Sequence, residues 1–214
     1  MADLFDEVDE ELRRDQFNRY WKKYGNFAIA GLVLIVVVTA GVVGWREYTK
    51  QQRIQYSEQF TAAIALVQDN KSNEAIDALG ALAQDANIGY ATLARFRGAA
   101  LKAKAGDREG AAAEYDALSK DSSIDKLYSG LAGLYYVLNT IDSGDPEALA
   151  TRLTPLTDAE SPWRFSAREF SALLAIRQGK PDKAVEIYTQ LADDAQTPTG
   201  ARARAAEMLR ALKQ

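Results

Sequence analysis

A run of 19 uncharged residues near the N-terminus constrains the fold of this chain more than any other feature. It extends from Phe27 to Trp45 and reads FAIAGLVLIVVVTAGVVGW. At about 1.5 Å per residue, a helix of this length measures about 28 Å, close to the ~30 Å hydrocarbon core of a bilayer. The sequence therefore predicts one transmembrane helix over residues 25–45. Aromatic residues, which favour the headgroup level, flank the run on both sides: Tyr20, Trp21, Tyr24, Trp45 and Tyr48.

Two other interpretations of this run remain open. A cleaved secretory signal would have a short basic leader, whereas the residues before this run include seven acids. A helix buried in a soluble core would rarely lack charge on every face over such a length. The run therefore favours a membrane anchor over both alternatives.

Basic residues flank the run unequally, which bears on its orientation. Because positive charge is retained on the cytoplasmic side of a membrane, the bias favours a cytoplasmic tail over residues 1–24 and a bacterial periplasmic location for residues 46–214. Ala40 and Gly44 form a small-residue pair that is compatible with a homo-oligomer. Five basic residues precede the run and three follow it within a similar distance: Arg13, Arg14, Arg19, Lys22 and Lys23, against Arg46, Lys50 and Arg53.

Composition restricts the function. The chain has 26 basic and 30 acidic residues, a net charge of −4, and no basic block as dense as nucleic-acid binding requires. It has no histidine and no cysteine, which removes the commonest general base, the usual metal-binding nitrogen and every thiolate nucleophile. We therefore expect no catalytic activity, no cofactor, no metal site and no nucleic-acid partner.

The chain after the run contains a repeat. Four alanines, Ala75, Ala111, Ala148 and Ala184, are spaced by 36, 37 and 36 residues. Ten positions after each of them lies an aspartate: Asp85, Asp121, Asp158 and Asp194. Five positions before three of them lies a residue that suits a turn: Asn70, Gly106 and Gly179. A period of this length is typical of stacked helical hairpins.

Two units resemble the tetratricopeptide repeat most closely: GDREGAAAEYDAL (residues 106–118) and GKPDKAVEIYTQL (residues 179–191). The Ala148 unit departs from it, with Arg152 at the aromatic position and Pro155 at the leucine position. The resemblance implies an all-α fold, in which a single N-terminal transmembrane helix precedes a tetratricopeptide-like α-solenoid of about four helical hairpins plus a C-terminal capping helix. After the span we expect helices over residues 46–69, 73–84, 90–105, 108–119, 125–141, 146–153, 162–178, 181–194 and 198–212.

The order of these features supports a narrower resemblance. An acidic tail precedes a span that ends in GWREY (residues 44–48), and the repeats contain YATLARFRGAALKAKAGDREGAAAEYDAL (residues 90–118). This combination is similar to the bacterial YfgM-like family, described as the ancillary subunit of the SecYEG translocon. The resemblance implies a single-pass inner-membrane protein whose periplasmic domain associates with the Sec translocon and with periplasmic chaperones or client polypeptides. A membrane-anchored scaffold for envelope assembly or cell division is the alternative.

The repeat pattern also predicts a binding surface. Tetratricopeptide arrays bind partners mainly on the inner face of the first helix of each pair, and an apolar face there suits an extended or amphipathic polypeptide segment. Ordinary core packing is the alternative explanation for the same residues. Carried onto this chain, the spacing selects Phe60, Ile64, Val67, Leu93, Phe96, Ala100, Gly130, Gly133, Val137, Leu173, Ile176 and Arg177.

A second candidate contact patch lies near a predicted helix start and comprises Trp163, Arg164 and Arg168. Tryptophan and arginine are enriched at interaction hot spots. A tryptophan that covers the core, with solvated arginines beside it, is the alternative. Glu169 lacks the second carboxylate or activated nucleophile that acid–base catalysis would need.

Overall fold

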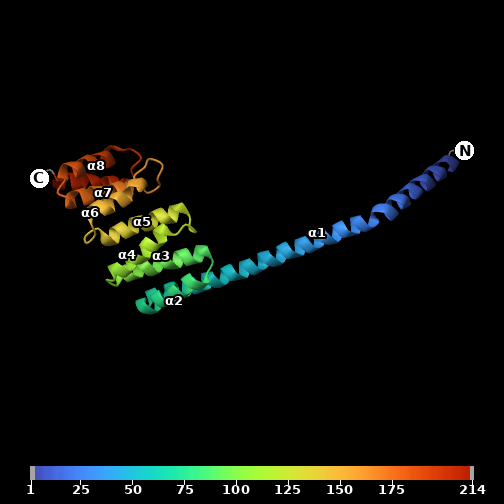
Figure 1. Ribbon diagram of the computed structural model, residues 1–214, viewed down its shortest axis with the longest axis horizontal. Helices are drawn as coiled ribbons and strands as arrows, with labels where there is room; N and C mark the ends of the chain where they lie inside the picture. The colour runs from blue at the N-terminus through green and yellow to red at the C-terminus, as the bar shows by residue number, and fades with distance from the viewer. Residues whose placement is uncertain (1–2, 213–214) are drawn as a thin grey trace. The chain divides into compact units, whose positions relative to one another are not determined.

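The computed structural model describes residues 3–212, with side chains from residue 18 onward except at positions 20 and 28. All regular elements in this range are helical, which confirms the predicted fold class (Figure 1). The chain divides into two compact units, Met1–Gln55 and Tyr56–Gln214. The first helix, α1 (Asp3–Gln68), belongs to the first unit up to residue 55 and contributes its last turns to the second.

The apolar run lies within α1, and those of its side chains that the structure describes are exposed. None of its most apolar 18-residue window is buried, and this part of the helix is long and apolar enough to cross a membrane. Leu32 and Ile35, for example, are 66% and 67% exposed. The structure therefore does not bury the run in a protein core, which is the opposite of what a soluble core helix would show.

The helix continues without a break past the predicted end of the span at residue 45. No glycine or proline occurs between Trp45 and Gln68, so nothing in the local sequence ends the helix there. From the sequence we expected a span over residues 25–45 and a separate helix over residues 46–69. In the structure both belong to the single helix α1.

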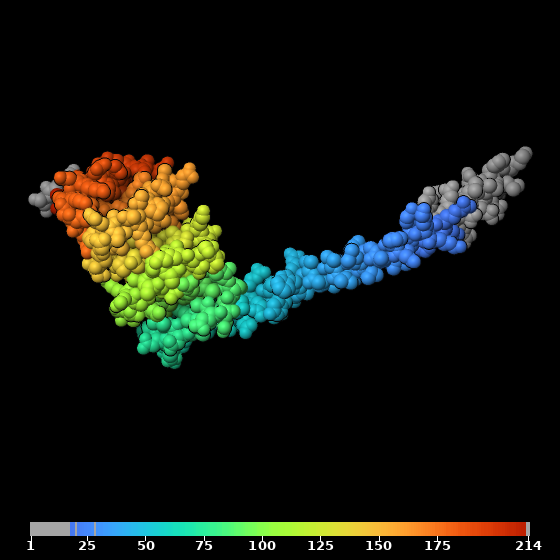
Figure 2. Space-filling model, in the orientation of Figure 1, coloured from blue at the N-terminus to red at the C-terminus, as the bar shows by residue number. Residues whose placement is uncertain are grey.

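The second unit is a stack of antiparallel helices (Figures 1 and 2). Each boundary after residue 70 lies within two residues of the predicted one. We call the end of α1, α3, α5 and α7 the A helices, and α2, α4, α6 and α8 the B helices. The helices are α2 (Ser72–Asp85), α3 (Ile88–Lys104), α4 (Arg108–Lys120), α5 (Lys126–Thr140), α6 (Pro146–Leu153), the 3₁₀ turn η1 (Thr154–Leu156), α7 (Arg164–Arg177), α8 (Pro181–Asp193) and α9 (Thr199–Leu212).

Three A helices end in the same left-handed turn. Asn70, Gly106 and Gly179 have φ values of 62°, 96° and 69°, a region that favours glycine and tolerates asparagine. After Asn70, the Lys71 amide donates to the Leu66 carbonyl at 2.9 Å. This is the Schellman arrangement, and equivalent bonds follow the two glycines. The predicted turn positions are confirmed.

Small residues let the hairpins close. Ala75, Ala111 and Ala184 are fully buried, with 0% exposure each. Helix axes can approach only where one side lacks bulk, and large neighbours then fill the remaining space. Tyr115 and Tyr188, four residues after their alanines, do so at 2% and 1% exposure.

The third hairpin uses a shifted register. Ala148 is exposed, whereas Leu149 and Leu153 are 3% and 0% exposed. The buried positions of α6 are therefore displaced by one residue relative to the other B helices. On α5 of the same hairpin, a Cβ atom at Gly130 would lie only 2.9 Å from Trp163 Cδ1 and 3.3 Å from Leu156 Cδ2, so the lack of a side chain there makes room for these two residues.

The last helix closes the stack as predicted. α9 packs on α7 and α8, and Ala205 is fully buried in the cluster that contains Tyr188. Arg204 Nε and Nη2 donate to the Glu169 carboxylate at 2.6 and 2.7 Å. This bidentate pair fixes α9 against α7 and raises the pKa of Arg204 through the hydrogen bonds and charge of Glu169.

Candidate partner-binding surface

The exposed apolar side chains of the repeat unit gather on two neighbouring A helices. Within the described part of residues 56–214, the large hydrophobic residues exposed by more than about a third all lie on α3 or α5. Such side chains would be spread over many helices if they were incidental. They are Ile88 (53%), Leu93 (45%), Leu127 (43%), Tyr128 (41%), Tyr135 (37%) and Leu138 (45%).

Aromatic contacts join the two helices into one surface. The Phe96 ring lies 6.4 Å from the Tyr128 ring and 6.3 Å from the Tyr135 ring, measured between centroids. On α5, residues 128, 131, 135 and 138 follow at helical spacing and share one face. We call this area the α3–α5 surface and define it by Leu93, Phe96, Leu127, Tyr128, Leu131, Tyr135 and Leu138.

Tyr115 supports this surface from below. Its ring stacks on Tyr135 with centroids 5.1 Å apart, and its hydroxyl donates to the Phe96 carbonyl at 3.4 Å. Burial, followed by the interaction with Tyr135, raises the pKa of Tyr115 to about 12. The phenol therefore stays protonated at neutral pH and acts as a hydrogen-bond donor.

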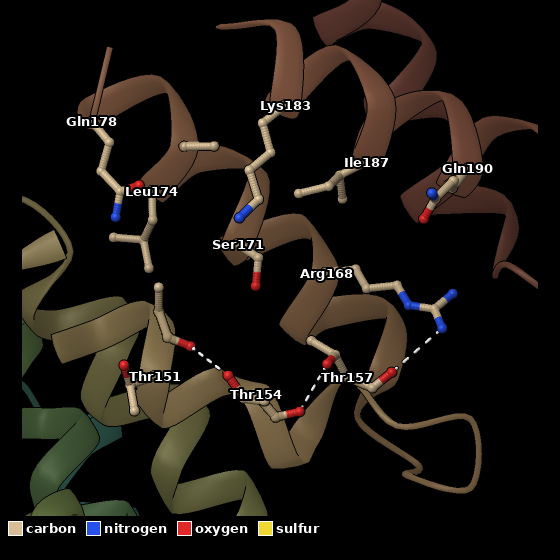
Figure 3. Close-up of a pocket in the computed structure, with 12 residues that line it drawn as sticks. Thr151, Thr154, Thr157, Arg168, Ser171, Leu174, Gln178, Lys183, Ile187 and Gln190 are labelled. Atoms are coloured by element: carbon tan, nitrogen blue, oxygen red, sulfur yellow. Dashed lines mark hydrogen bonds between the residues drawn. The ribbon is translucent and has the colours of Figure 1, made fainter. Parts of the chain in front are cut away.

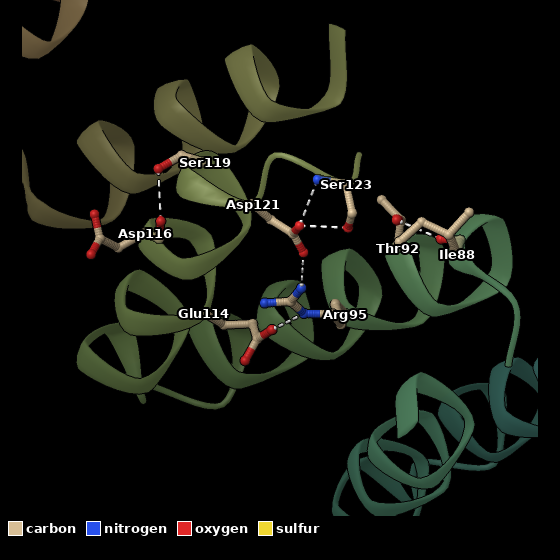
Figure 4. A network of polar contacts seen from close by, with 8 residues as sticks. All are labelled: Ile88, Thr92, Arg95, Glu114, Asp116, Ser119, Asp121 and Ser123. Carbon is tan, nitrogen blue, oxygen red and sulfur yellow. Dashed lines mark hydrogen bonds and ion pairs between the residues drawn. The ribbon is translucent and has the colours of Figure 1, made fainter. Parts of the chain in front are cut away.

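An ion-pair network holds α3 against α4 (Figure 4). Arg95 Nε donates to Glu114 Oε1 at 2.5 Å, and Arg95 Nη1 donates to Asp121 Oδ2 at 3.1 Å. The hydroxyl and amide of Ser123 donate to the other oxygen of Asp121. These hydrogen bonds from Ser123, with a contribution from Arg95, lower the pKa of Asp121. Because the network uses the side of α3 away from Leu93, it positions that helix without occupying the α3–α5 surface.

Arg152 stands at the aromatic position of the irregular third unit, and its contacts show what it does there. Its guanidinium lies 4.0 Å from the Tyr136 ring centroid and 2.6 Å from Asp116 Oδ1. Burial acts to raise the pKa of Asp116, but hydrogen bonds from Lys120 and Arg152 outweigh it and hold the pKa below its ordinary value. Arg152 thus points at α4 and α5, while Leu153 takes the buried position that an aromatic residue occupies in α4 and α8.

The structure brings only some of the predicted groove residues to the surface. Leu93 and Phe96 belong to the α3–α5 surface, and Ala100 is exposed on the same side of α3. Gly130 and Gly133 lie beneath the side chain of Leu156. The remaining predicted residues of the first three units are half-buried or buried: Phe60, Ile64, Val67 and Val137.

Val137 requires a correction, because it is 0% exposed and packs in a core cluster with Leu134 and Leu153. It cannot line an open groove. Residues 128, 131 and 135 have the same spacing as residues 93, 96 and 100, so the inner face of α5 lies two residues earlier than predicted. The aromatic and leucine-rich composition of residues 127–138 was the available signal for Tyr128, Tyr135 and Leu138.

The predicted residues of α7 connect helices. Leu173 and Ile176 are half-buried, and Ile176 packs against the cluster that contains Tyr188. Arg177 Nη1 donates to the carbonyls of Ile141 and Gly144, the latter at 3.1 Å, and so ties α7 to the segment after α5.

The Trp163 patch is divided among different contacts. Trp163 Nε1 donates to the Leu127 carbonyl at 3.0 Å, which places the half-buried indole against the start of α5. Arg164 lies 4.2 Å from the Phe165 ring centroid, and its Nη2 donates to Gln196 at 3.0 Å. Arg168 instead donates to the Thr157 carbonyl at 3.4 Å and lines a groove. Each of the three side chains is therefore engaged in a contact within the protein.

That groove lies among α6, α7 and α8 and has a volume of about 460 Å³ (Figure 3). Its hydroxyls are largely committed to their own helix, as when Thr151 donates to the Glu147 carbonyl and Ser171 to the Ala167 carbonyl. A second groove, about 850 Å³, lies over α2, α3 and α4. In the described residues, no group of three or more acidic side chains is arranged to hold a metal ion.

Comparison with known proteins agrees with this architecture. A family model described as the tetratricopeptide repeat-like domain matches residues 18–213. Neither the curated proteins nor the solved structures gave a match. The matched range includes the apolar part of α1 together with all the repeat helices, and it covers most of the 214 residues. The chain therefore belongs to the tetratricopeptide repeat-like domain family.

Proposed function

We propose that this protein is a membrane-anchored adaptor that captures other polypeptides on the α3–α5 surface. Repeat domains of this class typically serve as scaffolds for protein–protein interaction. The observation that carries the proposal is the confinement of the exposed large apolar side chains of the repeat unit to α3 and α5. Apolar patches of this kind mark interaction sites on soluble domains.

The proposal extends to location and partners. The exposed apolar part of α1 supports a single span, and the excess of basic residues before it supports a cytoplasmic tail over residues 1–24. The repeat unit then lies in the periplasm. The resemblance to the YfgM-like family supports association with the Sec translocon and with periplasmic chaperones or their clients.

Site-specific photocrosslinking in intact cells tests the adaptor function. A photoreactive residue at Leu138, which is 45% exposed on the α3–α5 surface, should form adducts with translocon subunits or chaperones. The matched position is Ala117, which is exposed on α4 outside this surface, and few adducts are expected there. Mass spectrometry identifies the products. Equal adducts at both positions would contradict the proposed surface, and division-site proteins at Leu138 would favour the scaffold alternative.

The orientation can be measured by cysteine labelling, because the chain has no cysteine of its own. Ser122 is exposed between α4 and α5, so Ser122→Cys provides a single reactive thiol. We expect a membrane-impermeant maleimide to label this variant fully in intact spheroplasts. Labelling that appears only after lysis would place the repeat unit in the cytoplasm.

A further inference from the structure

The two helices that carry the α3–α5 surface also carry charge of one sign only. Together α3 and α5 contain five basic residues and no acidic residue. In contrast, α2 contains three acids and no base. The five basic residues are Arg95, Arg97, Lys102, Lys104 and Lys126.

Two of these cations lie beside the apolar side chains. Arg97 and Lys104 follow Leu93 by four and eleven residues, which places all three on one face of α3. Both are exposed, and neither takes part in the ion pairs found among the described residues. Arg95 differs, because Glu114 and Asp121 already neutralise it. The surface is thus apolar along α5 and positively charged along one edge of α3.

We propose that the partner of this surface is an acidic amphipathic helix of about three turns. The inference rests on the proposed function and specifies the chemistry of its partner. From Leu127 to Leu138 the apolar stripe of α5 rises about 17 Å, the length of three helical turns. A helix whose apolar side chains recur at three- and four-residue intervals would bury them between α3 and α5. Acidic residues on its flank would then face Arg97 and Lys104.

Two observations favour such a partner over other occupants. A lipid surface is recognised by clusters of about four to eight basic residues, whereas among the described residues two exposed cations, Arg97 and Lys104, share the face of α3 that carries Leu93. The acids of α2, namely Glu74, Asp77 and Asp85, lie on the neighbouring B helix and repel an acidic segment from that side. These charges therefore direct an acidic helix to the α3–α5 surface. They determine the orientation of the bound helix more than its affinity.

A pair of designed peptides tests the inference on the full-length protein in nanodiscs of zwitterionic lipid. Both are labelled helices of about 14 residues with the same leucine positions, one with glutamate and one with lysine at the flanking positions. Fluorescence anisotropy should show that the glutamate peptide binds at least about fivefold more tightly at low salt. This preference should shrink as salt screens the charges. Equal affinity for the two peptides would overturn the inference.

Charge reversal locates the interaction. The double variant Arg97→Glu and Lys104→Glu should lose the preference and favour the lysine peptide. The matched control, Lys183→Glu with Arg210→Glu, makes the same change in net charge at exposed positions on α8 and α9 and should keep the preference. Retention of the preference in the first variant would overturn the inference.

The outcomes also separate this inference from the proposed function. If Tyr135→Asp abolishes crosslinking to natural partners while neither peptide shows a charge preference, the adaptor function stands and the acidic-helix inference fails. If crosslinking is unchanged in Tyr135→Asp, the surface itself is wrong. Nanodiscs with anionic lipid should leave binding of the glutamate peptide largely intact, whereas loss of that binding through occupation of the surface by lipid would overturn the inference.

Discussion

Replacement of Leu149 by alanine should lower the free energy of unfolding of the repeat unit by about 2–5 kcal/mol. Leu149 is 3% exposed and packs with Leu134, Leu153 and Leu174, so the change leaves a cavity that its neighbours fill only in part. Because about 1 kcal/mol shifts the melting temperature of a chain of this size by roughly 2–4 °C, the variant should melt roughly 4–20 °C below the parent. Circular dichroism during heating measures the shift.

Leucine substitutions at Ala148 and Ala111 compare the third hairpin directly with a regular one. Ala148→Leu should change stability by no more than about 0.5 kcal/mol, because Ala148 is exposed. Ala111→Leu, at the equivalent position of the sequence repeat, should cost about 1–3 kcal/mol, because Ala111 is fully buried. If Ala148→Leu proved as damaging as Ala111→Leu, the shifted register of the third hairpin would be wrong.

The elements that the sequence predicts well are those whose causes are local. Helix ends follow from residues that act within one turn, such as Gly106 and Gly179 with positive φ. The N-cap side chain of Asp107 likewise accepts a hydrogen bond from the Gly110 amide at 2.8 Å. The buried positions of α2, α4 and α8 were also predicted, because within each helix the position of the alanine and the helical period together determine which residues share its face.

The inner face of α5 could not be predicted because its cause is not local. In the third hairpin the buried positions of α6 are Leu149 and Leu153, and the space at Gly130 on α5 is taken by Trp163 and Leu156. These contacts become evident only when the neighbouring helices are in place. The repeat alignment, extended through α5, therefore selected Val137 of the core and passed over Tyr135, which is 37% exposed.

The same reasoning applies to Trp163 and Arg177. The residue type of Trp163 and the repeat spacing of Arg177 suggested a partner contact. Instead, the hydrogen bonds from Trp163 Nε1 to the Leu127 carbonyl and from Arg177 Nη1 to the Gly144 carbonyl join α7 to the start of α5 and to the segment that follows α5. Composition does not distinguish a side chain that binds a partner from one that binds the next repeat. The sequence predicts both ends of α7 to within two residues, yet the contacts of Trp163 and Arg177 depend on how α5 packs beside α7.

Charge in the apolar run should remove the protein from the membrane. Val36 and Val37 lie at the centre of the run and are 58% and 62% exposed, so substitution there disturbs no packed core. An aspartate at the centre of a span costs about 2.5–3.5 kcal/mol on insertion scales, and Val36→Asp with Val37→Asp together should cost roughly 5–7 kcal/mol. We expect the double variant to leave the carbonate-resistant membrane fraction and appear in the soluble fraction.

The leucine variant at the same two positions is the matched control, because it keeps the length and apolar character of the run and should remain in the membrane. Both variants should retain the helical melting transition of the repeat unit, since its clusters contain none of these residues. Intact mass measurement of the parent protein addresses the signal-peptide alternative, because cleavage would remove the N-terminal residues. A doubly charged variant that stayed in the membrane, with its repeat unit folded, would show that the run before Arg46 is not what holds the protein there.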